Sequence, residues 1–76
     1  MGELEAIRTF LTVADQSSFS AAARRLGMTP ASVTRTVSGL EDELGVQLLL
    51  RTTRKVSLTS AGAAYAARIA PLVEGL

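Results

Sequence analysis

Residues 18–35 decide the fold, and they read SFSAAARRLGMTPASVTR. A glycine after the last helical turn accepts the positive φ of a C-cap, so Gly27 predicts the end of a helix. Thr29 and Pro30 then supply an N-cap and a proline at the first helical position, where the missing N–H costs nothing. Three consecutive alanines let the two helices cross closely. The stretch therefore predicts a helix-turn-helix.

Hydrophobic spacing extends this prediction toward both ends of the chain. Apolar residues recur at intervals of three and four over 3–15, which predicts an amphipathic helix. In the helix-turn-helix, the first helix is expected over 21–26, with Ser20 as its N-cap and Phe19 just outside. The second is expected over about 30–44, with an inward face formed by Val33, Val37, Leu40 and Leu44.

Beyond Gly45 the apolar period changes from that of a helix to that of a strand. The alternation predicts a short antiparallel hairpin with a basic tip, whose apolar positions are Leu48, Leu50, Val56 and Leu58. Thr59 is expected to cap a last, Ala-rich helix that runs to Leu76. The predicted fold is mainly α with a small β-hairpin.

The composition excludes most catalytic and cofactor chemistry. The chain has 76 residues, a net charge of +1, no Cys and no His. It therefore has no disulfide, no zinc finger and no thiol or imidazole catalysis. Neither a GxxxxGKS or GxxxxGKT motif nor GxGxxG occurs, so no nucleotide cofactor is implied. We expect one small, non-enzymatic domain without cofactor or metal.

The sequence also lacks a membrane signal. Its longest run without a charge, 56–67, is too short and too polar for a span, and the amino end has no secretory leader. We expect a cytoplasmic protein that contacts no membrane.

Charge is segregated along the chain. Residues 21–40 carry three arginines and no acidic residue, whereas residues 41–43 are Glu-Asp-Glu. The beginning of the helix 30–44 can therefore approach phosphates, while its end points away from them. Its first turns offer small side chains, hydroxyls and a guanidinium to base edges in a major groove. We expect base contacts from Thr29, Pro30, Ala31, Thr34 and Arg35.

The segment 51–55, RTTRK, places three cations and two hydroxyls at the hairpin tip. This composition suits flanking phosphates or the minor groove. The same charges would also keep a hairpin edge from pairing with another chain, and that interpretation stays open. Arg24 and Arg25 point about 100° apart, so at most one of them should face phosphate. The expected backbone contacts are Ser18, Ser20, Arg24, Ser32, Ser38, Arg51, Thr52, Arg54 and Lys55.

Four motifs in register resemble the amino-terminal domain of LysR-type transcriptional regulators. They are SFSAAARRL (18–26), TPASVTR (29–35), LEDELGV (40–46) and RTTRKVSLTSAG (51–62), and the resemblance covers nearly the whole chain. It implies a bacterial winged helix-turn-helix domain over 1–58, with a recognition helix at about 30–44 in the major groove and a basic wing at 51–55. It also implies a linker helix over 59–76 that pairs two subunits. Intact members carry a much larger effector-binding domain after it, so the chain resembles a fragment.

An apolar edge on the last helix supports this pairing. Apolar residues from Gly62 to Leu76 are spaced 4, 3, 4 and 3 apart, which leaves a heptad-like seam for a partner helix. Packing within one chain is the other interpretation of such residues. The dimer contacts that we expect are Tyr65, Ile69, Leu72, Val73 and Leu76. A tetramer stays open for the intact protein.

Two classes of function remain open. In the first, the chain binds a double-stranded DNA operator as a homodimer and controls transcription. In the second, the winged fold is a protein-interaction module whose basic patch meets an acidic protein partner. Sequence-specific DNA binding is the first choice.

Overall fold

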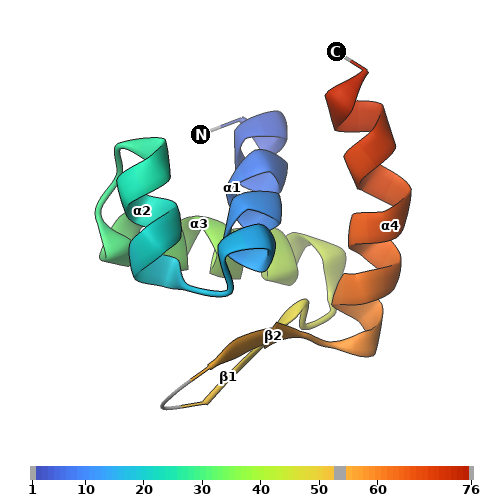
Figure 1. Cartoon of the computed structure of the whole chain (residues 1–76). Coiled ribbons are helices and arrows are strands. Elements are labelled where there is room, and N and C mark those ends of the chain that lie inside the picture. The colour runs from blue at the N-terminus through green and yellow to red at the C-terminus, as the bar shows by residue number, and fades with distance from the viewer. Residues whose placement is uncertain (1, 53–54, 76) are drawn as a thin grey trace.

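The computed structural model describes residues 2–52 and 55–75, and over these it has four helices and one hairpin. The elements are, in chain order, α1 (Glu3–Gln16), α2 (Phe19–Leu26), α3 (Pro30–Leu44), β1 (Leu49–Arg51), β2 (Val56–Leu58) and α4 (Ser60–Glu74). Figure 1 shows α1 to α3 as one group, the hairpin below them and α4 beside α1. The predicted mainly α fold with an antiparallel hairpin is confirmed. None of the described helices combines the length and apolar character of a membrane span.

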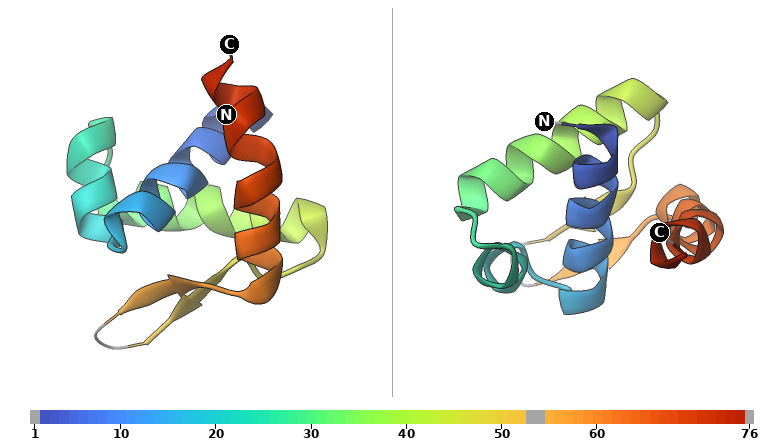
Figure 2. Two further views of the ribbon diagram at one scale, coloured as in Figure 1. Left: turned by 45° about the vertical axis from the view of Figure 1, so that its right-hand side comes forward. Right: turned by 90° about the horizontal axis from the view of Figure 1, so that it is seen from above.

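The core forms where α1 crosses α2 and α3, an arrangement visible from above in Figure 2. Phe10 of α1 is fully buried there, and the small side chains of Ala22 and Ala23 let α2 approach it closely. The ring centroid of Tyr65, in α4, lies 5.8 Å from that of Phe10. The two rings are tilted relative to each other, an arrangement that aromatic pairs prefer. The last helix is therefore attached to the same core.

The ends of α2 and α3 follow the capping residues predicted for them. Thr29 Oγ1 accepts the Ser32 N–H at 3.1 Å, and Pro30 stands in the first turn. Gly27 and Gly45 have φ angles of 69° and 71°, in the left-handed region that glycine enters without a Cβ clash. The turn between the two helices is thus fixed at both sides by local chemistry.

The beginning of α2 differs from the prediction. Ser20 was expected as its N-cap, but the helix begins at Phe19, and Ser18 Oγ accepts the Ala21 N–H at 3.1 Å. Both serines are suitable caps. The earlier beginning brings Phe19 onto the same helix face as Ala22 and Ala23, where it packs against the core.

The hairpin pairs Leu49 with Leu58 and Arg51 with Val56. The predicted alternation is wrong by one residue in β1, because Leu49 is 1% exposed and Leu50 is 49% exposed. Leu48 precedes the strand and is also buried, so two consecutive leucines enter the core before the alternation begins.

Leu44, expected on the inward face of α3, is likewise 40% exposed, whereas the other three residues of that face are buried. It is the last residue of the helix, and the chain turns away at Gly45.

The first turn of α4 lies against the start of the hairpin. Thr59 Oγ1 accepts the Gly62 N–H at 2.9 Å and donates to the Gln47 carbonyl at 2.6 Å. Gly62 is buried, and a Cβ at this position would overlap the carbonyl oxygen of Leu48. Gly62, expected at one end of the partner seam, is therefore occupied by a contact within the chain.

Candidate nucleic-acid interface

The beginning of α3 is open to solvent. Thr29, Pro30, Ala31 and Arg35 are exposed and Thr34 is half-buried, whereas Val33 on the other side of the helix is fully buried. The five side chains expected to contact bases thus lie away from the core, and none of them is needed to fill it.

A hydroxyl network organises this surface. Thr29 Oγ1 donates to Ser32 Oγ at 3.0 Å, and Arg35 Nη2 donates to the same oxygen at 3.3 Å. The Arg35 guanidinium is thereby drawn toward the beginning of α3, and its other N–H groups remain donors for external acceptors. Ser32, expected as a contact to the DNA backbone, is half-buried and holds Arg35 in this structure.

The two adjacent arginines of α2 have different surroundings. Both are exposed in the last turn of the helix. Arg25 lines a shallow cavity of about 310 Å³ together with Asp15 of α1 and Glu74 of α4. Arg35 of α3 likewise lines a cavity, of about 220 Å³, with Glu3 and Glu43, so nearby carboxylates do not by themselves distinguish the arginines.

Thr52 and Lys55, on either side of the hairpin tip, are hydrogen-bonded to each other. The Thr52 N–H donates to the Lys55 carbonyl at 2.9 Å, and the Lys55 N–H donates to Thr52 Oγ1 at 3.1 Å. Both residues are exposed. Of the predicted wing, Thr53 and Arg54 lie outside the described residues.

Arg51, at the end of β1, reaches back to the helices. Its Cζ lies 4.5 Å from the centroid of the Phe19 ring, and its Nη2 is 3.5 Å from Ser38 Oγ of α3. One cationic side chain thus joins the hairpin to both helices of the helix-turn-helix. Ser38, half-buried, and Arg51, exposed, were both expected at the DNA backbone, and the structure brings them together.

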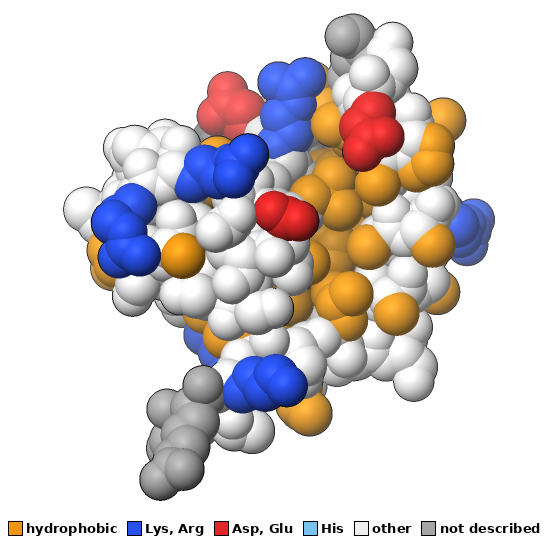
Figure 3. All heavy atoms as spheres, viewed as in Figure 1, with side chains coloured by type: hydrophobic (Ala, Val, Ile, Leu, Met, Phe, Trp, Pro, Cys, Tyr) orange, Lys and Arg blue, Asp and Glu red, His pale blue; other side chains and the backbone are white. Residues whose placement is uncertain are grey.

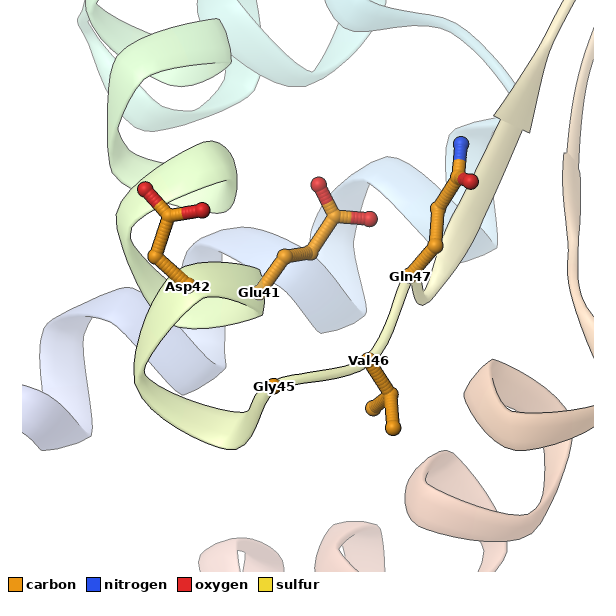
Figure 4. A pocket seen from close by; sticks show the side chains of 5 residues that line it. All are labelled: Glu41, Asp42, Gly45, Val46 and Gln47. Atoms are coloured by element: carbon orange, nitrogen blue, oxygen red, sulfur yellow. The ribbon is translucent and has the colours of Figure 1, made fainter.

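The acidic end of α3 has a structural task as well. Glu41 Oε2 accepts the N–H groups of Leu48 and Leu49 at 2.7 and 3.1 Å. Figure 4 shows the Glu41 side chain directed toward the start of β1, whereas that of Asp42 points away from it. The hairpin is therefore attached to α3 by a charge-assisted hydrogen bond to two amides.

The same end of α3 borders an open cavity of about 430 Å³ that both carboxylates line with Gly45, Val46 and Gln47. The negative charge of these carboxylates makes this end of α3 unfavourable for phosphate, in contrast to the basic surface at the beginning of the helix.

The remaining predicted contacts lie at the beginning of α2. Ser20 is exposed, and Ser18 is half-buried with its hydroxyl used as the helix cap. The hydroxyl of Ser18 can still donate to a phosphate while its oxygen accepts the helix N–H.

Sequence reasoning missed two residues that position the hairpin, Phe19 and Glu41. Phe19 was expected just outside the N-cap, and Glu41 only as part of the acidic end of the helix that points away from phosphates. The contact of Phe19 with Arg51 joins residues far apart in the chain, and the bonds of Glu41 reach beyond the end of its own helix, so no helical or strand spacing indicates them. The one available signal was a carboxylate at the end of a helix, shortly before two apolar residues of a strand.

Four of the five residues expected at a dimer contact lie along α4. Tyr65, Ile69 and Val73 are half-buried against the core, and Leu72 is 67% exposed. Burial, and secondarily the charge of Glu3, raises the pKa of Tyr65. Leu76 lies outside the described residues. Figure 3 shows the apolar side chains gathered between α1 and α4 on one face of the molecule.

Comparison with known proteins places this geometry in a family. Residues 4–63 match the family model described as "Bacterial regulatory helix-turn-helix protein, lysR family". The chain is 57% identical over 53 residues, 70% of its length, to the probable HTH-type transcriptional regulator LtrA of Klebsiella pneumoniae. It is 49% identical over 65 residues, 86% of its length, to the HTH-type transcriptional activator AaeR of Escherichia coli K12. These alignments span 17% and 21% of the two relatives, so the chain covers about a fifth of their length.

A solved structure matches over nearly the whole fold. It is the complex of the BenM DBD with catB site 1 DNA, which superposes with a TM-score of 0.92 at 34% identity. The match covers 97% of this chain and 80% of the BenM chain. The helices, the hairpin and α4 are thus arranged alike in the two proteins.

Proposed function

Because the chain belongs to the LysR family of bacterial regulatory helix-turn-helix proteins, we propose that it binds double-stranded DNA sequence-specifically as part of a transcriptional regulator. The observation that carries the proposal is the exposed beginning of α3. The side chains of Thr29, Thr34 and Arg35 lie there away from the core, and the acidic residues 41–43 are at the opposite end of the helix. A solved relative with the same fold is a DNA complex.

We assign the reading of bases to the beginning of α3 in the major groove. The residues of this surface are Thr29, Pro30, Ala31, Thr34 and Arg35. From α2 we propose Arg24 as the phosphate contact, an exposed side chain in the last turn of that helix. The other proposed backbone contacts are Ser18, Ser20, Ser32, Ser38, Arg51, Thr52, Arg54 and Lys55.

We propose that the chain has a DNA-binding part and a dimerisation part, with the boundary at the end of the hairpin. Residues 1–58 would contact DNA, and residues 59–76 would pair two subunits, so that the operator is a pseudo-palindrome. The named relatives are transcriptional regulators, and we assign no catalytic step to the chain. A regulator of bacterial transcription acts on the chromosome, so we expect it in the cytoplasm.

Salt dependence tests the proposed function. Log K for a duplex selected from random oligonucleotides should fall linearly with log salt, with a slope of about −0.9 for each phosphate neutralised. The selected duplex should also bind more tightly than a random one, by a factor of about 10³ or more at physiological salt. Isothermal gel shifts between 50 and 200 mM salt measure both quantities. Absence of a shifted band with any duplex at low salt would instead favour the acidic protein partner.

Leu72 offers the cleanest test of pairing through α4. It is 67% exposed, so Leu72→Glu removes little from the fold of one chain but places a charge in a buried partner seam. We expect the wild type to sediment as a dimer and Leu72→Glu to shift toward monomer, with an unchanged circular dichroism spectrum. The matched control is Ala67→Glu, which places the same charge at an exposed position on another face of the same helix. A wild type that is monomeric at micromolar concentration would contradict pairing by this segment.

A further inference from the structure

The contact between Arg51 and Phe19 is the feature that joins the hairpin to the helix-turn-helix near its tip. Arg51 is the last residue of β1, and Phe19 is the first residue of α2. The guanidinium carbon lies 4.5 Å from the ring centroid, within the range of a cation–π contact. The same side chain reaches Ser38 of α3 through Nη2 at 3.5 Å, the outer limit of a hydrogen bond.

The other hydrogen bonds that attach the hairpin to the helices lie at its opposite end. Glu41 binds the amides of Leu48 and Leu49, and the Thr59 N–H donates to the Leu48 carbonyl at 3.0 Å. These bonds fix the base of the hairpin. Nearer the tip, Val56 pairs with Arg51 and packs against the core, an apolar contact without a preferred direction. Arg51 adds the directional contact that can fix the slope of the hairpin relative to α3.

The two partners are suited to a positioning task. Phe19 is half-buried and packs against the core, so its ring is held by the body of the domain. A guanidinium is planar, stays charged and stacks on an aromatic face while its edges keep N–H donors available. Arg51 can therefore hold the hairpin and contact a phosphate at the same time.

We propose that Arg51 and Phe19 form a joint that fixes the orientation of the hairpin tip relative to α3. This proposal rests on the proposed function. The joint would set the distance along the duplex between the bases that α3 contacts and the phosphates that the hairpin tip contacts. Arg51 is thus a positioning residue in addition to a phosphate contact, and Phe19 acts on DNA binding without touching DNA.

The first test measures the orientation without DNA. The chain has no cysteine, so Asp42→Cys and Lys55→Cys together take one pair of spin labels, on the end of α3 and beside the tip. Pulsed electron spin resonance, with labelled protein diluted into unlabelled protein, gives the distance distribution within one chain. We expect a narrow distribution in this background, a broader one with Phe19→Leu or Arg51→Ala, and a narrow one with Phe19→Tyr, which keeps the ring. Equal widths in all four would overturn the joint.

The second test uses the duplex recovered by selection. Phe19→Leu leaves the charge unchanged, and we expect it to weaken binding about two- to five-fold, the value of an exposed cation–π contact. Phe19→Tyr should restore the affinity. A thermal melt of each variant separates this loss from simple unfolding.

A double-mutant cycle distinguishes positioning from general destabilisation. If the joint holds the tip on DNA, Lys55→Ala should cost less affinity with Phe19→Leu than with Phe19. Additive losses would contradict the joint while leaving DNA binding intact. Failure of the unsubstituted chain to bind any duplex would contradict the proposed function, and the spin-label result would still decide whether the joint exists.

Discussion

Gly62→Ala should lower the free energy of unfolding by about 3 kcal/mol, at the upper end of the cost of overpacking a core. The added Cβ would overlap the carbonyl oxygen of Leu48, which belongs to the backbone and cannot rotate away. Either α4 or the start of the hairpin must move, and the cap that Thr59 forms with both would be lost. Urea unfolding followed by circular dichroism measures the change.

Gly39→Ala is the matched control for this substitution. Gly39 lies inside α3, and its Cβ would meet nothing within 4 Å. Replacing an exposed helical glycine by alanine should raise the free energy of unfolding by about 0.5 to 1 kcal/mol. Opposite signs for the two substitutions are expected. An unfolding midpoint of Gly62→Ala equal to that of the wild type would show that the close approach of α4 is not required.

Arg35→Ala should cost about 1 to 3 kcal/mol of binding to the selected duplex, or roughly 5- to 150-fold in affinity, and should relax the sequence preference. Arg35 is exposed on α3, and its guanidinium donates to Ser32 Oγ at 3.3 Å, which directs it toward the beginning of the helix. Repeating the selection with the variant shows which base position loses its preference.

Lys55→Ala is the contrasting substitution at the hairpin. A phosphate contact reads no sequence, so its loss should weaken selected and random duplexes alike and reduce the salt slope by about one unit. If Arg35→Ala weakened the two kinds of duplex equally, Arg35 would be a phosphate contact, and base reading would have to come from the hydroxyls of α3.

The sequence predicted the parts of the fold that depend on neighbouring residues. Gly27 and Thr29 fixed the turn because positive φ and side-chain capping are local requirements. The N-cap of α2 was predicted wrongly because Ser18 and Ser20 are equally suitable as caps. The packing of Phe19 against the core decides in favour of Ser18.

Contacts between different elements were beyond such reasoning. The burial of Leu49 in place of Leu50 follows from where the hairpin joins α3, and the bond from Glu41 that sets this junction spans seven and eight residues. The candidate surface on α3 could be predicted because charge and small side chains mark it in the sequence. Its roles in DNA binding, residue by residue, stay predictions.

The absence of a side chain at Gly62 has a mechanical consequence. Two segments separated by a side chain can slide as its rotamer changes, but here the first turn of α4 and the Leu48 peptide meet directly. A change in the tilt of α4 is therefore expected to displace the Leu48 peptide and, through it, the start of β1.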